Sequence, residues 1–250
     1  MNIFLGPIYG RSLEPSHVQC LMKLLLKRYE GVQIRLAPAV NDALVCRARS
    51  KTATEFLMGT EDDVHVSVDG DIMFDADSLV EIARQALDTG GIVAGQYVTR
   101  SKSVCRPTSI QEVESTIEYA GDPTLVPIRW AATGFMATPR AVFQKLSEDL
   151  PLCHESEDWR FYPFYQPFPY RMEDGTWIYL SEDYALCERA KQAGFKLFMN
   201  PSIRLLHLGL HPFRLEDMLD KEPEQMAVTI TRMKDGRHQI EASATELVAV

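Results

Sequence analysis

The stretch Val64-His65-Val66-Ser67-Val68-Asp69-Gly70-Asp71-Ile72-Met73-Phe74 alternates apolar with other residues and then places two aspartates one residue apart. Apolar residues at a period of two are typical of a β-strand. Gly70 permits a sharp bend that points both carboxylates the same way, and paired carboxylate oxygens attract a divalent cation. Asp-Gly-Asp is also a common polar turn at the end of a strand, so the tripeptide alone leaves both interpretations open.

The residues around this stretch predict strands that alternate with helices. We expect strands at residues 3–5, 32–36, 64–69 and 92–98, and helices that begin near Pro15, near Lys51 and at Asp75 or Asp77. The last of these helices is expected to end at Gly90-Gly91. Gly6 to Gly10 is predicted to be the loop that leaves the first strand. This order is typical of an α/β fold with a parallel or mixed sheet and helices on both faces. Ligands of such sheets bind at the carboxyl ends of strands, which favours a metal site at Asp69 and Asp71.

The second half of the chain is less regular. We expect helices from Arg140 to Leu146 and from Ser181 to Gly194, and strands at 196–199 and 203–206. The stretch from Trp159 to Tyr170 is too rich in proline for regular structure. No repeat or linker divides the chain, which predicts a single domain over residues 1–213. Residues 214–250 are polar, and we expect a partly flexible segment with one amphipathic helix.

The composition argues against several classes of protein. A formal net charge of -9 over 250 residues gives no electrostatic footprint for tight, nonspecific binding to nucleic acid. The five cysteines are scattered without a Cys-x-x-Cys spacing, which suggests neither a disulfide framework nor a zinc site and favours a reducing, cytoplasmic location. The first apolar stretch is too short for a signal peptide, and no stretch is long enough to span a membrane.

Four motifs in order resemble the GT-A class of nucleotide-sugar-dependent glycosyltransferases, especially small bacterial and viral members. They are Asp69-Gly70-Asp71, Thr133-Gly134-Phe135-Met136 before Pro139-Arg140, the helix start at Glu182-Asp183, and His207 after a late strand. The resemblance covers roughly residues 2–213 and implies a Rossmann-like, mixed and mainly parallel sheet flanked by helices. It also implies a nucleotide-binding half at 1–100 and an acceptor-side half at 101–213.

The resemblance implies that Mn²⁺ or Mg²⁺ holds the diphosphate of a nucleoside-diphosphate sugar. Asp71 takes the role of direct metal ligand, and Asp69 that of a partner to the ribose or to the metal through water. His207 completes the coordination, with His211 as the second choice. A carboxylate and an imidazole are reasonable ligands for Mn²⁺, although His207 as an ordinary loop histidine remains the alternative.

The resemblance also implies a carboxylate base near the start of the late helix, which assigns Asp183 first and Glu182 second as catalytic residues. The alternative is that Ser181 and both acids are only helix-cap and first-turn residues. In the same class a base of this kind belongs to inverting enzymes, and retaining enzymes share the metal site. The sequence leaves the stereochemistry open.

Further residues are assigned by position in the resemblance, each with a structural alternative. Pro7, Tyr9, Arg49 and Gly70 lie on the nucleotide side, where the alternatives are a simple loop and a solvated arginine. The stretch between donor sugar and acceptor contains Trp130, Thr133, Gly134 and Phe135, for which the alternative is a buried strand with a packed tryptophan. The aromatic residues between Trp159 and Tyr170 form either an acceptor platform or a hydrophobic cluster under a loop.

The leading function is therefore a metal-dependent glycosyltransferase that transfers a sugar to an acceptor hydroxyl. The acceptor is a glycan, a protein, a lipid-linked sugar or a modified nucleobase. One alternative is a nucleotidyltransferase of the same fold, which needs a glycine-rich basic loop after the first strand that Gly6 to Gly10 matches poorly. Another is a sugar-nucleotide or glycan binding module without turnover.

Overall fold

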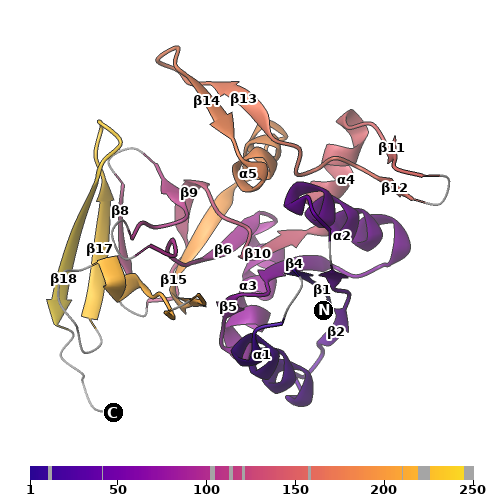
Figure 1. Ribbon diagram of the computed structural model, residues 1–250, viewed down its shortest axis with the longest axis horizontal. Coiled ribbons are helices and arrows are strands. Elements are labelled where there is room, and N and C mark those ends of the chain that lie inside the picture. The colour runs from indigo at the N-terminus through magenta and orange to yellow at the C-terminus, as the bar shows by residue number, and fades with distance from the viewer. Residues whose placement is uncertain are drawn as a thin grey trace.

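In the computed structural model, nine strands form a central sheet in the order β2-β1-β4-β10-β6-β15-β9-β7, with β3 beside β1 (Figure 1). The structure describes residues 1–10, 13–40, 42–101, 105–112, 115–119, 122–156, 159–209, 211–218 and 226–244. The strands of the sheet are β1 (Asn2–Tyr9), β2 (Gln33–Leu36), β3 (Ala39–Val40), β4 (Val64–Asp69), β6 (Ile92–Gln96), β7 (Ile110–Gln111), β9 (Val126–Trp130), β10 (Phe135–Pro139) and β15 (Leu197–Arg204).

Strand directions in this sheet are mixed. β1 pairs in parallel with β2, β3 and β4, and β6 pairs in parallel with β15. β10 runs antiparallel between β4 and β6 and joins the two parallel parts. Five helices of the described chain flank the sheet: α1 (Pro15–Leu26), α2 (Val45–Gly59), α3 (Ala76–Thr89), α4 (Arg140–Asp149) and α5 (Glu182–Gln192). The prediction of a mixed α/β fold in one domain is confirmed.

Alternate residues of each strand supply two separate cores, because successive side chains point to opposite faces of a sheet. In β1, Ile3 and Leu5 pack with α1 and α3, whereas Phe4 packs with α2, α4 and α5. Figure 1 shows α1 and α3 below the sheet and the other three helices above it. Both faces are therefore covered, and the carboxyl ends of β1, β4 and β6 remain as the edge at which side chains can meet a ligand.

The predicted ends of α3 are confirmed. Asp75 caps the helix by accepting a hydrogen bond from the Asp77 backbone N–H at 2.8 Å. Gly90 ends it with φ 64°, a left-handed conformation that glycine adopts without steric cost. β6 begins two residues later, at Ile92, and β10 separates it from β4 in the sheet.

Several boundaries differ from those expected. Residues 6–9 continue β1 instead of forming a loop, because β4 and β3 pair with them through Asp69 and Val40. α2 begins at Val45 instead of Lys51. The two late strands are one strand, β15, with a shift in register after Asn200. The proline-rich stretch, expected to lack regular structure, contributes two short strands that pair with neighbours on either side: β12 (Arg160–Phe161) with β11 (Cys153–His154), and β13 (Phe168–Arg171) with β14 (Trp177–Leu180).

The C-terminal segment contains strands where a helix was expected. After η1 (Leu215–Met218), β17 (Met226–Arg232) and β18 (His238–Ala244) form a hairpin that pairs with β8 (Thr116–Tyr119). Val228 and Ile230 are buried, and the Gln111 side chain donates a hydrogen bond to Ile230 O at 2.7 Å. Alternation of apolar residues over 226–232 is the signal for this strand. The boundary at residue 213 and the two functional halves stay predictions.

Candidate active site

Asp69 is the last residue of β4, and its side chain lies on the α2 face of the sheet. Val66 and Val68 pack on the opposite face, so the period of two directs Ser67 and Asp69 toward α2. Arg49 Nη2 lies 3.0 Å from Asp69 Oδ1 and donates a hydrogen bond to Asp69 Oδ2 at 3.1 Å. Arg49 Nη1 donates to Ser67 Oγ at 3.4 Å. The strand end and the helix are thus joined by a charge-assisted contact.

Arg49 is a buried cation, with only 4% of its side chain exposed. Burial opposes the charged form, but the carboxylates of Asp69 and Asp183 outweigh it and raise the pKa of Arg49. The interpretation of Arg49 as a solvated arginine is therefore wrong. The description of a solvated arginine suits Arg47 better, because Arg47 is more exposed and pairs with Asp42 at 2.7 Å.

Gly70 makes a close approach that no other residue allows. Its φ is not positive, so the bend does not depend on a left-handed backbone. A Cβ at this position would collide with the ring of Tyr9 and lie 3.1 Å from Ile8 O. The Gly70 N–H donates to that same Ile8 O at 3.0 Å. The glycine is thus required because β1 lies directly against the turn, which corrects the reason given from the sequence.

Asp71 and His207 meet through a two-stranded sheet of β5 (Ile72–Met73) and β16 (Leu206–His207). Ile72 is the register partner of His207, and the Leu208 N–H donates to Asp71 O at 2.7 Å. His207 Nε2 lies 3.6 Å from Asp71 Oδ2. His207 Nδ1 lies 2.7 Å from Val98 O, a group that only accepts, so we assign the ring hydrogen of the neutral imidazole to Nδ1. That tautomer leaves the Nε2 lone pair on the side of Asp71.

Arg100 is a residue of this site that the sequence analysis missed. Its Nη1 lies 2.7 Å from Asp71 Oδ2 and donates to Leu208 O at 3.3 Å. Burial raises the pKa of Asp71, but a protonated His207 ring, which can donate to the carboxylate, and the Arg100 guanidinium outweigh this effect and lower the pKa below its usual value. Arg100 follows the carboxyl end of β6. Ligands bind at the carboxyl ends of strands, which is the rule that selected Asp69 and Asp71. The same rule applied to β6 would have found Arg100.

The donor set of Asp71 and His207 fits a divalent cation with further ligands from outside the chain. Within the described residues, no three His, Cys, Asp or Glu side chains gather closely enough to hold a metal. A carboxylate oxygen and an imidazole nitrogen suit Mn²⁺, and the hydrogen bond from Nδ1 to a backbone carbonyl orients the ring as ligating histidines require. The second choice, His211, instead lies 3.3 Å from Asp217 Oδ1.

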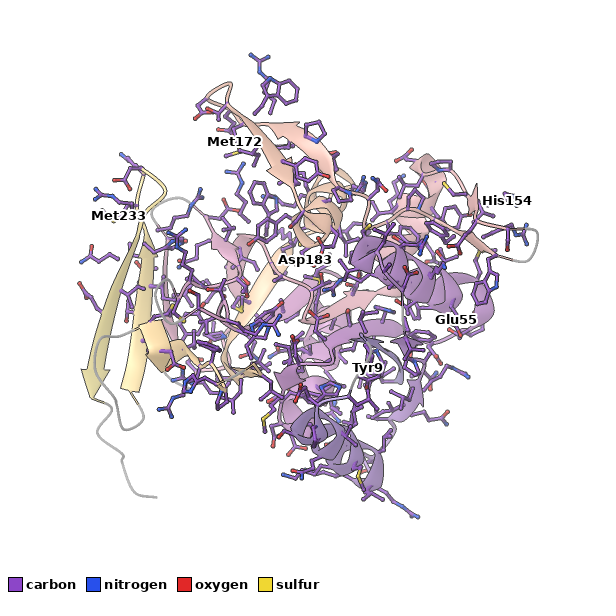
Figure 2. All side chains as sticks on the ribbon, in the orientation of Figure 1. Tyr9, Glu55, His154, Met172, Asp183 and Met233 are labelled. Atoms are coloured by element: carbon purple, nitrogen blue, oxygen red, sulfur yellow. The ribbon has the colours of Figure 1, made fainter. Side chains whose placement is uncertain are left out.

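Asp183 lies in the first turn of α5 and faces the sheet edge (Figure 2). The Thr133 hydroxyl donates to Asp183 Oδ1, and Arg49 Nη2 lies 3.8 Å from the same oxygen. Burial raises the pKa of Asp183 to about 6; the Arg49 charge lowers it and the neighbouring charge of Glu182 raises it. Ser181 is the N-cap, but its side chain makes no cap hydrogen bond. Asp183 therefore carries the kind of pKa that suits proton transfer near neutral pH.

The residues assigned between donor sugar and acceptor divide into two groups. Trp130 and Phe135 are buried, and Trp130 Nε1 donates to Glu188 Oε2 at 2.9 Å, which supports their interpretation as packed core residues. Thr133 contacts Asp183 as described above. The Gly134 N–H donates to the Tyr97 hydroxyl at 3.1 Å, and Gly134 O accepts from the Asp69 N–H at 3.0 Å.

Pro7 and Tyr9 lie within β1 and not in a loop, so neither presents an open face to a nucleotide base. Tyr9 is 8% exposed, and its hydroxyl lies 3.3 Å from His17 Nε2. His17 Nδ1 in turn lies 2.7 Å from Ile72 O. His17 thus joins β1 to the strand that follows the turn at Gly70.

Most of the aromatic stretch after residue 159 belongs to the core. Phe164 and Tyr165 are fully buried, and the Phe143 and Phe164 ring centroids lie 4.9 Å apart. Tyr162, Phe168 and Tyr170 are partly buried against the same core, whereas Trp159 is 61% exposed. The hydrophobic-cluster interpretation therefore holds for the buried rings.

Comparisons with known proteins agree with this architecture at the level of the fold. No family model and no curated protein matches the chain. Among solved structures, A197 from STIV matches with a TM-score of 0.52 and 10% identity over 100% of this chain and 99% of that protein. GalNAc-T7, in a structure titled "with UDP, GalNAc and Mn2+", matches with a TM-score of 0.51 and 11% identity. That match covers 89% of this chain and 45% of GalNAc-T7. The chain has a GT-A-like fold.

Proposed function

We propose that this protein is a metal-dependent glycosyltransferase that transfers a sugar from a nucleoside-diphosphate sugar to an acceptor hydroxyl. The observation that carries the proposal is the approach of His207 Nε2 to Asp71 Oδ2 at 3.6 Å, at the carboxyl end of β4. Residues distant in sequence supply the two ligands that a diphosphate-bound cation needs. The presence of UDP, GalNAc and Mn²⁺ in the GalNAc-T7 structure supports this donor class.

On the donor side, Asp71 and His207 would hold Mn²⁺ or Mg²⁺. The ion supplies Lewis-acid stabilisation of the departing diphosphate, worth several kcal/mol in general. Asp69 is the partner of the ribose or of a metal-bound water, with its carboxylate fixed by Arg49 at 3.0 Å. Gly134, whose backbone bonds to Asp69 and Tyr97, has no room for a Cβ, because the Tyr97 side chain packs directly against it.

On the acceptor side, Asp183 accepts the proton of the attacking hydroxyl. Its pKa of about 6 means that the carboxylate is ionised at neutral pH and still basic enough to take a proton. Thr133 and Arg49 both contact Asp183 Oδ1 and fix the orientation of the carboxylate. Glu182 acts on Asp183 through its charge, which makes Asp183 a stronger base.

Two further findings bear on the alternatives. Gly6 and Pro7 lie inside β1 instead of in a loop that cradles a triphosphate, which disfavours the nucleotidyltransferase. No helix of the described chain is long and apolar enough to cross a membrane.

The acceptor class, whether glycan, protein, lipid-linked sugar or nucleobase, is set by surfaces outside the donor site.

A thermal-shift screen of nucleoside diphosphates and their sugar conjugates, with and without MnCl₂, tests the donor half. We expect one nucleotide to raise Tm only with Mn²⁺, because ligand binding stabilises the folded state by mass action. Asp71→Ala should remove the Mn²⁺-dependent part of the shift. A shift of equal size without metal or in Asp71→Ala would contradict the proposal, and a response to nucleoside triphosphates alone would favour the nucleotidyltransferase.

A further inference from the structure

The carboxylate that would bind the metal already has a cationic partner. Arg100 Nη1 lies 2.7 Å from Asp71 Oδ2, the same oxygen that faces His207 Nε2 at 3.6 Å. Arg100 also donates to Leu208 O at 3.3 Å. It therefore contacts both Asp71 and the residue that follows His207. One oxygen therefore faces a guanidinium and an imidazole together.

A guanidinium and a divalent cation cannot share this oxygen closely. At a few ångströms, like charges repel strongly in a partly buried site. Half of the Arg100 side chain is exposed, at 49%, and its stem can rotate away from Asp71. Arg49 differs, because it is enclosed at 4% exposed and bound to Asp69. Of these two arginines, Arg100 is the one able to change partner.

We propose that Arg100 is the counter-ion of Asp71 in the metal-free protein and that it exchanges Asp71 for the diphosphate of the donor when the cation binds. The proposal rests on the proposed function. A diphosphate adds negative charge beside the same cation, and a planar guanidinium pairs with phosphate oxygens through two parallel hydrogen bonds. Arg100 thus weakens binding of the bare metal and strengthens binding of the metal with diphosphate.

Arg100→Gln tests both effects, with Mn²⁺ alone and with inorganic pyrophosphate in saturating Mn²⁺ as probes. Bound Mn²⁺ is counted by the loss of the free-ion EPR signal, and pyrophosphate binding by calorimetry. We expect Mn²⁺ to bind about 3- to 10-fold more tightly in the variant, since a partly exposed competing ion pair is lost. Pyrophosphate should bind about 10-fold more weakly, since a hydrogen bond to a charged group is lost.

Arg237→Gln is the matched control, because Arg237 is 84% exposed and pairs with Asp235, two residues away, at 2.6 Å. It removes the same charge and should leave both affinities unchanged. Equal effects of the two variants would show a general change in net charge and overturn the proposal, as would unchanged Mn²⁺ or pyrophosphate affinity in Arg100→Gln. If Asp71→Ala also leaves Mn²⁺ binding unchanged, the metal site of the proposed function fails as well. If it abolishes Mn²⁺ binding, only the role of Arg100 fails.

Discussion

His207 Nε2 faces Asp71 Oδ2 at 3.6 Å across the antiparallel pair of β5 and β16. His207→Ala should leave the fold intact and lower Mn²⁺ affinity by about 10-fold or more, because a ligand to the metal is lost. Titration of Mn²⁺ followed by EPR measures the change. His211→Ala is the matched control, since His211 pairs with Asp217 at 3.3 Å. Unchanged Mn²⁺ affinity in His207→Ala would remove His207 from the site.

Arg49→Met should destabilise the protein strongly. The substitution leaves Asp69 and Asp183 without the buried guanidinium that lies 3.0 Å and 3.8 Å from them. Loss of one partner from a buried charge group costs about 3–5 kcal/mol, which urea denaturation at pH 7 measures. The exposed Lys145–Glu148 pair provides the control, because Lys145→Met should cost less than about 1 kcal/mol. A similar cost for both substitutions would show that Arg49 does not act as a buried counter-ion.

The rate of transfer should depend on the protonation of Asp183. Burial raises the pKa of this group to about 6, so log(kcat/KM) should rise with pH below about 6 and level off above it. Glu182→Gln removes a neighbouring negative charge and should move the rise to lower pH. Asp183→Asn should abolish turnover while donor binding persists. Normal transfer in Asp183→Asn would favour a helix-cap role or a retaining mechanism.

His65 should make stability depend on pH. Among the residues that the structure describes, neither buried ring nitrogen has a hydrogen-bond partner, and the ring stacks on Phe4 with the centroids 5.5 Å apart. Burial first, and the Arg49 charge second, lower the pKa of His65 from 6.5 to about 3. The unfolded chain therefore takes up a proton below pH 6.5 that the folded chain excludes, and stability falls as the pH drops from about 6.5 toward 3.

His65→Leu tests this directly, since it removes the titrating group and two unpaired nitrogens. Its free energy of unfolding should fall less steeply between pH 6 and 4, by about 1 kcal/mol per pH unit. Urea denaturation at several pH values gives the slope. His154 is exposed, and His154→Leu should keep the slope of the wild type. The same slope in all three proteins would contradict the burial of a neutral His65.

The sequence predicted those site residues that lie at the carboxyl end of a strand. The alternation in β4 placed Asp69 and Asp71 at the carboxyl edge, and the same rule at the end of β6 points to Arg100. His207 was expected at a strand end as well. Its approach to Asp71 depends on the pairing of β16 with β5, two strands of two residues each, which no periodicity can predict.

The role of Arg49 could not be predicted for a different reason. The helix was expected to begin at Lys51 but begins at Val45, and its N-cap, Leu44, makes no side-chain cap hydrogen bond. An arginine in a polar stretch is usually exposed. Its burial follows from two partners on other elements, Asp69 and Asp183, and only the folded sheet brings these carboxylates together.

Release of nucleoside diphosphate from a panel of nucleoside-diphosphate sugars in MnCl₂ tests the central claim most directly. We predict release from one donor by the wild type and by Asp88→Ala, an exposed acid in α3. EDTA should stop the release, and Asp71→Ala should lower it by about 100-fold or more, as loss of the metal's stabilisation requires. Equal release by Asp71→Ala, or donor binding without release from any sugar and acceptor, would contradict the account.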